Sequence, residues 1–230
     1  MSIKMHLDQL IEKHPELSGL RESISQAAGI IIKTFTAGGK LLICGNGGSS
    51  SDSDHIVGEL MKSFEIKRPL DISFRERLAE VSGSRGEYLA EKLEHGLPAI
   101  SLSAHTSLTS AICNDIDPDL VFAQQVIGYG NENDLLFAIS TSGNSLNVID
   151  ACITAKAMTM TVIGITGKTG GKLKEYCDIL INVPGDSTAS VQELQLPVYH
   201  AICRVVEEHF YGEVGSRKSE DGSKKLAVGK

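Results

Sequence analysis

The chain has 230 residues, of which 41% are hydrophobic and 22% are charged, and its formal net charge is −7. This balance predicts one soluble globular domain with a full core. Nucleic acid selects basic surfaces, so the acidic balance argues against it as a partner, although a local cradle can still bind an anionic substrate. No stretch of about 20 apolar residues could span a membrane and no signal peptide opens the chain, so we expect a cytoplasmic protein without a membrane partner.

The five cysteines show no C-x-x-C spacing, are odd in number and have apolar neighbours: Cys44, Cys113, Cys152, Cys177 and Cys203. A regular disulfide framework requires paired cysteines in an oxidising compartment. The pattern here predicts reduced thiols in the core of a cytosolic protein.

The chain opens with a predicted helical region, residues 3–36, which the glycines at 38 and 39 end. After it, short runs rich in Val, Ile and Leu alternate with helical patterns. The predicted strands are 40–44, 98–103, 134–140, 160–165 and 178–183, and the predicted helices are 50–64, 106–113, 119–128, 145–157, 171–176 and 189–211. This alternation predicts an α/β fold, a three-layer sandwich with a five-stranded parallel sheet between two layers of helices. Ligands of such sheets bind outside the carboxyl ends of the strands.

Residues 67–96 interrupt the alternation. Arg68 and Pro69 end a helix, and two short charged helices, 74–81 and 87–93, follow. Two interpretations stay open: a solvated decoration, or a lid or interface element that shapes the pocket. We expect a single domain, 1–212, with N-terminal helices in 1–37 and this insertion, followed by a disordered tail, 213–230.

A glycine-rich turn follows the first predicted strand. Gly45, Gly47 and Gly48 allow a tight bend and close approach to a ligand, and the turn leads into a helix whose N-terminus favours an anion. Further along that helix, His55 and Glu59 are four residues apart and share a face. The turn fits neither the dinucleotide fingerprint nor a P-loop. An anion cradle beside a His/Glu pair indicates chemistry on a phosphorylated compound.

A second loop of the same design follows the third predicted strand. It reads Ser140-Thr141-Ser142-Gly143-Asn144-Ser145, and its four hydroxyl groups lead into another helix start. A capped helix with solvated serines accounts for one of these hydroxyls but not for four. We therefore predict a phosphate contact here. The loop at 166–171, after the next strand, is interpreted as a turn.

Five pieces of the sequence, in order between residues 40 and 210, resemble the sugar isomerase (SIS) domain family and, within it, the phosphoheptose isomerases. They are Cys-Gly-Asn-Gly-Gly-Ser at 44–49, His55-x-x-x-Glu59, Asn114-Asp115, the serine loop at 140–145, and Thr188-Ala189-x-Val191-Gln192-Glu193 with His200. The serine loops mark the domain family, and the His/Glu and Gln/His pairs mark the isomerase branch. The resemblance implies the SIS fold.

The resemblance also implies roles for individual residues. The phosphosugar would be held by Asn46, Gly47, Gly48, Ser49, Ser140, Thr141, Ser142 and Ser145, its hydroxyls by Asn114 and Asp115, with further contacts from Glu59 and Gln192. Zinc would be bound by His55, Glu59, Gln192 and His200. Glu59 would act as the base and His200 as the acid. Family members are usually homotetramers with the site between subunits.

The implied reaction turns sedoheptulose 7-phosphate into D-glycero-D-manno-heptose 7-phosphate, for the heptose of lipopolysaccharide or related glycans. Moving a proton between adjacent carbons through an enediol needs a base at the carbon and an acid at the oxygen, and zinc can polarise the carbonyl. Gln192 and His200 are eight residues apart, a helical rise of about 12 Å, so a straight helix cannot offer both to one metal. An irregular helix start, a kink near Pro197 or a site shared between subunits would resolve this.

Two other functions stay open. Non-catalytic SIS adaptors keep the fold but lose the acid and base, whereas this chain has Glu59 and His200. Sugar-phosphate-sensing regulators usually carry a helix-turn-helix domain, for which residues 1–36 are too short and too acidic. The chain departs from the family pattern at Gln195, where members often have His, and in the length of the 67–96 insertion. Both departures allow a different sugar phosphate as substrate.

Overall fold

The computed structural model describes residues 3–212, so the predicted disordered tail, 213–230, lies outside the described residues. Its centre is a five-stranded parallel sheet in the order β2-β1-β3-β4-β5. The strands are β1 (Leu41–Gly45), β2 (Ala99–Ser101), β3 (Leu135–Ser140), β4 (Thr161–Thr166) and β5 (Ile179–Asn182). The predicted α/β class and the five predicted strands are confirmed.

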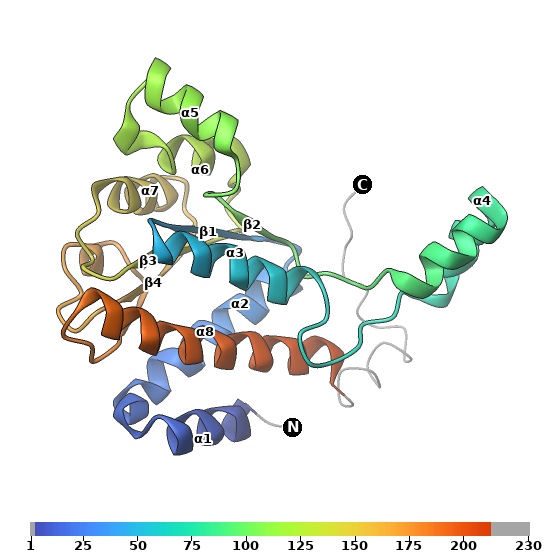
Figure 1. Ribbon diagram of the computed structural model, residues 1–230, viewed down its shortest axis with the longest axis horizontal. Coiled ribbons are helices and arrows are strands. Elements are labelled where there is room, and N and C mark those ends of the chain that lie inside the picture. Colours follow the sequence, from blue (N-terminus) through green and yellow to red (C-terminus); the bar gives the residue numbers. More distant parts are fainter. Residues whose placement is uncertain (1–2, 213–230) are drawn as a thin grey trace.

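Helices cover both faces of the sheet (Figure 1). One face carries α1 (Ile3–Lys13), α2 (Arg21–Thr36), α3 (Gly48–Met61) and α8 (Thr188–Tyr211), and the other carries α5 (Thr106–Asp115), α6 (Ala123–Tyr129) and α7 (Leu146–Ala157). Short 3-10 turns occupy Pro15–Leu20, Pro118–Leu120 and Leu173–Glu175. Within residues 3–212, none of the helices has the length and apolar character needed to cross a membrane.

Each face of the sheet has its own aliphatic core, because side chains alternate along a strand. In β1, Leu41 and Ile43 point toward α2, α3 and α8, whereas Leu42 and Cys44 point toward α7. The five cysteines are free, and three of them are buried: Cys44, Cys152 and Cys203. The predicted core position is wrong for Cys113, which is exposed on α5, because only one side of that helix packs on the domain.

Proline and glycine explain where the helices differ from the prediction. The expected helix over 3–36 is interrupted at His14, because Pro15 starts a 3-10 turn. The expected helix over 171–176 is wrong, since Gly170 and Gly171 both have positive φ and only a 3-10 turn follows. In contrast, α8 continues through Pro197.

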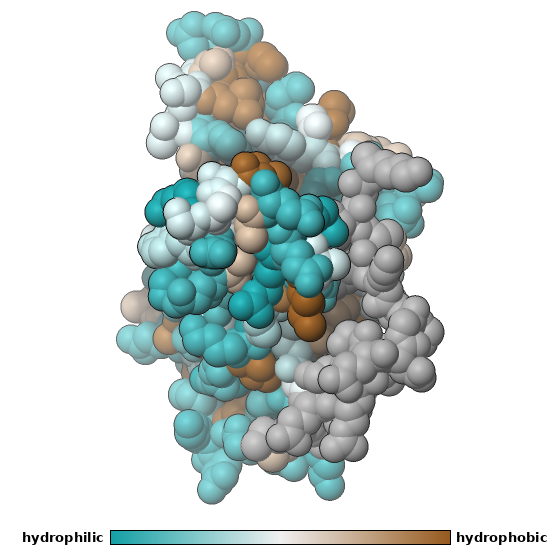
Figure 2. Space-filling model, turned by 90° about the vertical axis from the view of Figure 1, so that its right-hand side faces the viewer, coloured by the Kyte–Doolittle hydropathy of each residue, from teal (hydrophilic) through white to brown (hydrophobic). Residues whose placement is uncertain are grey.

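The insertion, α4 (Ile72–Lys92), consists of two helices separated by a kink at Ser82 and Gly83, whose backbone angles are not helical. The two predicted helices are confirmed. The insertion projects from the body beyond the C-terminal end of α3, whereas the carboxyl edge of the sheet lies at the start of α3 (Figure 1). The side of the molecule from which α4 projects is mainly hydrophilic with separate hydrophobic spots (Figure 2). Ile72 and Val81 are among the exposed side chains of α4. In the single chain α4 therefore does not cover the carboxyl edge of the sheet.

Candidate active site

The first glycine loop joins β1 to α3, and its glycines permit close contacts and an unusual backbone angle. At Gly45 a Cβ atom would lie 2.7 Å from the carbonyl oxygen of Ser49. Gly47 has a φ of 56°, which glycine adopts without strain. At Gly48, the first residue of α3, a Cβ atom would lie 2.1 Å from Nε2 of Gln192. The loop thus brings the Gln192 amide against the start of α3. Asn46, Gly47 and Gly48 are exposed, whereas Ser49 is buried.

The second loop joins β3 to α7 and carries the predicted hydroxyls. Oγ of Ser140 lies 3.1 Å from Oγ of Ser145. Gly143 has a φ of 65°, and a Cβ atom there would lie 2.2 Å from the carbonyl oxygen of Gly170. The turn after β4, which contains Gly170, therefore packs closely against the serine loop and supports it.

The two loops meet at the carboxyl edge of the sheet. The side-chain amides of Asn46 and Asn147 exchange two hydrogen bonds, of 2.8 and 3.0 Å, between them. β1 and β3 are neighbours, and ligands of sheets with this strand order bind between the loops of these two strands. Asn147 was missed by the sequence analysis, because it follows the serine motif and only the fold brings it to Asn46.

The two helices that follow these loops, α3 and α7, lack side-chain caps. Neither α3 nor α7 has a capping hydrogen bond, and the hydroxyl of Ser145, the N-cap of α7, faces Ser140 instead. At α8, by contrast, Ser187 and Ser190 form a complete capping box. Uncapped helix starts offer N–H groups and a favourable dipole to an anion. We call the loops at 45–49 and 140–145 the anion cradle.

α3 runs beside α8 (Figure 1). A cluster of polar side chains lies further along α3, where it faces α8. Nε2 of His55 is 3.1 Å from Oε1 of Glu59, and the ring centroids of His55 and His200 are 5.0 Å apart. The parallel packing of α3 and α8 therefore brings together three of the four predicted metal ligands. Two of them, Glu59 and His200, are also the predicted base and acid.

Tyr199 and Asp52, which the sequence analysis did not single out, orient His55. The hydroxyl of Tyr199 donates to Oδ1 of Asp52 at 3.2 Å and lies 3.0 Å from Nδ1 of His55. The Tyr199 hydroxyl therefore holds the Nδ1 side of the His55 ring, while Nε2 on the other side faces Glu59. Burial raises the pKa of both Asp52 and Tyr199. Asp52 stands three residues before His55 on the same helical face, which is the signal that could have identified it.

Two atoms of this cluster have unused hydrogen-bonding capacity. Oε2 of Glu59 and Nε2 of His200 are buried and have no hydrogen-bond partner. Buried polar groups are normally satisfied, so such atoms indicate a place for a ligand, a water or an ion. Burial lowers the pKa of His200, and His55 and Arg204 act in the same direction. The imidazole of His200 is therefore neutral at pH 7 and keeps one N–H group to donate.

The predicted zinc ligands are only partly brought together. The nitrogen and oxygen donors of His55, Glu59 and His200 fit the chemistry of zinc, and two of their donor atoms have no partner. Gln192, however, lies against Gly48, and a continuous helix separates it from His200 by about 12 Å. Across residues 3–212, the His, Cys, Asp and Glu side chains form no group of three or more arranged to hold a metal ion. The single chain therefore does not present a complete zinc site.

Asn114 and Asp115 lie at the end of α5, as predicted, but away from the cluster. Both are exposed, and Nδ2 of Asn114 donates to Oδ1 of Asp115 at 2.7 Å. Among the hydrogen bonds of the described part of the chain, none joins this pair to the anion cradle. In a single chain these residues and the cradle form separate surfaces.

Comparisons with known proteins agree with this architecture. The SIS domain family model matches residues 7–76 and 84–167, and the interruption falls inside α4. A phosphoheptose isomerase from Helicobacter pylori strain P12 is 38% identical over 213 residues, which cover 89% of this chain and 97% of the relative.

Two solved structures have the same arrangement. The phosphoheptose isomerase from Neisseria gonorrhoeae matches with a TM-score of 0.69 and 33% identity over 90% of this chain and 97% of its own. The one from Francisella tularensis matches with a TM-score of 0.70 and 30% identity over 90% and 96% of the two chains. The chain therefore belongs to the SIS domain family of phosphosugar isomerases and, within it, to the phosphoheptose isomerases.

Proposed function

We propose that this chain interconverts sedoheptulose 7-phosphate and D-glycero-D-manno-heptose 7-phosphate. The observation that carries the proposal is the placement of the anion cradle and the polar cluster on one face of α3. His55 and Glu59 follow Gly48 by seven and eleven residues, so the three share a face, with rises of about 10 and about 16 Å. This separation suits a long open-chain sugar phosphate, whose phosphate and carbonyl lie at opposite ends.

Glu59 and His200 supply the proton transfers in this proposal. Oε2 of Glu59, which has no partner in the folded chain, removes the proton from the carbon next to the carbonyl. The N–H of the neutral His200 imidazole donates to the carbonyl oxygen, which gives an enediol. Reprotonation by Glu59 at the neighbouring carbon and loss of the other hydroxyl proton to His200 complete the exchange, so no proton is gained or lost overall.

Zinc and a homotetramer are parts of the same proposal. His55, Glu59 and His200 would hold the ion, which when bound would polarise the substrate carbonyl. Gln192 cannot join them from the same α8, so we infer that a four-ligand site needs a second chain. The exposed position of Asn114 and Asp115 on α5 also supports a site completed by another copy.

The assembly and the metal can be tested together. Light scattering is expected to give the mass of four chains, and metal analysis of that species is expected to find zinc. Treatment with a chelator should lower turnover, and added zinc should restore it. A metal-free protein with full turnover would contradict the zinc assignment, and a monomer with full turnover would contradict the shared site.

The proposed reaction is tested by NMR of sedoheptulose 7-phosphate incubated with purified protein. The wild type and Glu80→Gln, the same change of side chain on the projecting α4, should produce an aldose signal, whereas Glu59→Gln should produce none. No product with the wild type would exclude this substrate. Product at the wild-type rate with Glu59→Gln would exclude Glu59 as the base.

A further inference from the structure

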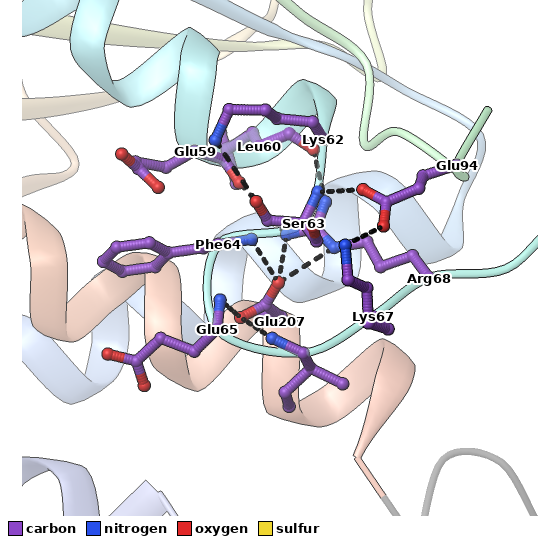
Figure 3. A network of polar contacts seen from close by, with 11 residues as sticks. Glu59, Leu60, Lys62, Ser63, Phe64, Glu65, Lys67, Arg68, Glu94 and Glu207 are labelled. Carbon is purple, nitrogen blue, oxygen red and sulfur yellow. Dashed lines mark hydrogen bonds and ion pairs between the residues drawn. The ribbon is translucent and has the colours of Figure 1, made fainter. Parts of the chain in front are cut away.

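A buried ion pair joins the loop after α3 to the last turns of α8 (Figure 3). Nη2 and Nε of Arg68 donate to Oε1 of Glu207 at 2.7 and 3.0 Å. The two side chains are 0% and 1% exposed. Such a pair loses more in desolvation than its attraction returns, unless further hydrogen bonds satisfy both charges.

Glu207 satisfies its charge with backbone N–H groups of the loop. Its Oε1 accepts from the N–H of Phe64 at 2.8 Å, and its Oε2 accepts from Glu65 at 2.8 Å and from Ile66 at 3.2 Å. These three amides are consecutive and belong to the segment that leaves α3. One carboxylate on α8 therefore fixes the path of the chain beyond the end of α3.

Arg68 satisfies its charge at the end of α3 itself. It donates from Nη1 to the carbonyl of Leu60 at 2.6 Å and from Nη2 to the carbonyl of Glu59 at 3.0 Å. These carbonyls lie in the last turn, where a helix has no partners of its own and a cation is favoured. The ring of Tyr211 lies 4.9 Å from the guanidinium carbon and covers one of its faces. We call Arg68 and Glu207, with these bonds, the clamp.

Both proposed catalytic groups are tied to this clamp. Arg68 holds the backbone of Glu59 directly. Glu207 follows His200 by seven residues on α8, and the ring of Phe64, whose N–H Glu207 binds, lies 5.4 Å from the His200 ring. The clamp therefore connects the last turn of α3, the loop after it and α8 at one point.

We propose that Arg68 and Glu207 are positioning residues that fix the placement of Glu59 relative to His200. An apolar pair could fill the same volume without the desolvation cost, but it could not bond three loop amides and two helix carbonyls at once. The inference rests on the proposed function, because it takes Glu59 and His200 as the base and the acid. Arg68 and Glu207 act through these two residues.

The test separates turnover from substrate affinity. The clamp lies about 16 Å along α3 from the anion cradle, so its loss should leave KM near the wild-type value. For Arg68→Lys, which keeps the charge but loses the planar fork, and for Glu207→Gln, kcat should fall on the order of 10²-fold, the cost of a misplacement of about 1 Å.

Asp134→Asn is the matched control. Asp134 is also buried, pairs with Lys40 at 2.5 Å, and accepts from the backbone N–H of Lys40 and of Asn131. This pair lies where β1 and β3 begin, at the sheet edge opposite the cradle. The control should lower the melting temperature but keep the wild-type kcat per folded chain. An equal fall of kcat in the control, or a wild-type kcat in both clamp variants, would overturn the proposal.

A measurement without substrate keeps the clamp testable if the proposed reaction fails. If the wild-type protein makes no aldose, the substrate assignment is contradicted. The clamp can then still be tested by amide hydrogen exchange. In Arg68→Lys, exchange should become at least 10-fold faster at residues 59–66, with no change at residues 48–52 at the start of α3. Unchanged exchange at 59–66, or a uniform increase along α3, would show that the clamp does not hold this end of the helix.

Discussion

The two ends of α3 differ in how their polar groups are satisfied. At the N-terminal end, Gly47 and Gly48 are exposed and the helix has no side-chain cap. At the C-terminal end, Arg68 bonds the last carbonyls and Glu207 bonds the loop that follows. The N-terminal end leaves hydrogen-bonding capacity open, as an anion site requires, whereas the C-terminal end is held by the hydrogen bonds of Arg68 and Glu207.

This difference assigns separate tasks to the two ends. Changes at the open end should act on the affinity for the phosphate, and changes at the closed end should act on turnover. His55, Glu59 and His200 lie between the ends, where α3 and α8 are in contact. The following experiments would either break this separation or define it more closely.

The largest effect is expected for His200→Gln. Without its imidazole the carbonyl oxygen loses its acid, so kcat should fall about 10²- to 10⁴-fold. KM should change little, because the cradle is at the far end of α3. The control is His95→Gln, which removes an imidazole from a partly exposed ion pair with Asp71 in the insertion. A KM that rises as much as kcat falls would mean that His200 binds substrate rather than transferring a proton.

Gly48→Ala tests the open end. The new methyl group would lie 2.1 Å from Nε2 of Gln192 and would displace that amide from the start of α3. We expect KM to rise about 10-fold, equivalent to about 1.4 kcal/mol of binding, with a smaller change in kcat. Gly58→Ala on the same helix meets no atom within 4 Å and should keep the wild-type KM while stabilising the fold by up to about 1 kcal/mol.

A smaller effect is expected where a helix start is closed. Ser187→Ala removes the capping box of α8 and should lower the free energy of unfolding by about 1 kcal/mol without changing KM. Ser145→Ala should instead raise KM and leave the free energy of unfolding unchanged, because the Ser145 hydroxyl faces Ser140 and does not cap α7. Urea unfolding and steady-state kinetics of the two variants check this contrast. Equal losses of stability would show that Ser145 serves the helix and not the ligand.

The sequence predicted what depends on local pattern. Alternating runs gave the five parallel strands, and glycine with hydroxyl residues marked both loops of the cradle. The pair His55 and Glu59 followed from helical spacing alone. Prediction was weaker where proline and glycine compete with helix propensity, as at Pro15 and at residues 170–171.

The rest of the site depends on contacts that no local pattern encodes. Asn46 meets Asn147 across 101 residues, and Arg68 meets Glu207 across 139. The sequence analysis treated Arg68 only as part of the end of a helix, since burial of an arginine cannot be read from its neighbours. Tyr199 was overlooked beside His200 for the same reason. Only the parallel packing of α3 and α8 gives these residues their partners.

The smallest expected effect is a pH dependence at His6, which lies near the closed end. Its side chain is buried and neither ring nitrogen has a hydrogen-bond partner. Burial lowers its pKa below the ordinary value of 6.5, while Glu208 and Glu65 act in the opposite direction and Arg204 adds to the lowering. The folded chain therefore prefers the neutral ring.

The sign of the effect follows from this preference. Above pH 6.5 the ring is neutral in both the folded and the unfolded chain, and stability is complete. As the pH falls below that value, the unfolded chain takes up a proton before the folded chain does, so stability decreases. His6→Leu removes the titrating group. When the pH is lowered from about 7.5 to about 5.5, the free energy of unfolding should therefore fall less in this variant than in the wild type. Equal losses in urea unfolding would show that His6 accepts the proton in the folded state without cost, which would place water or a carboxylate at its ring.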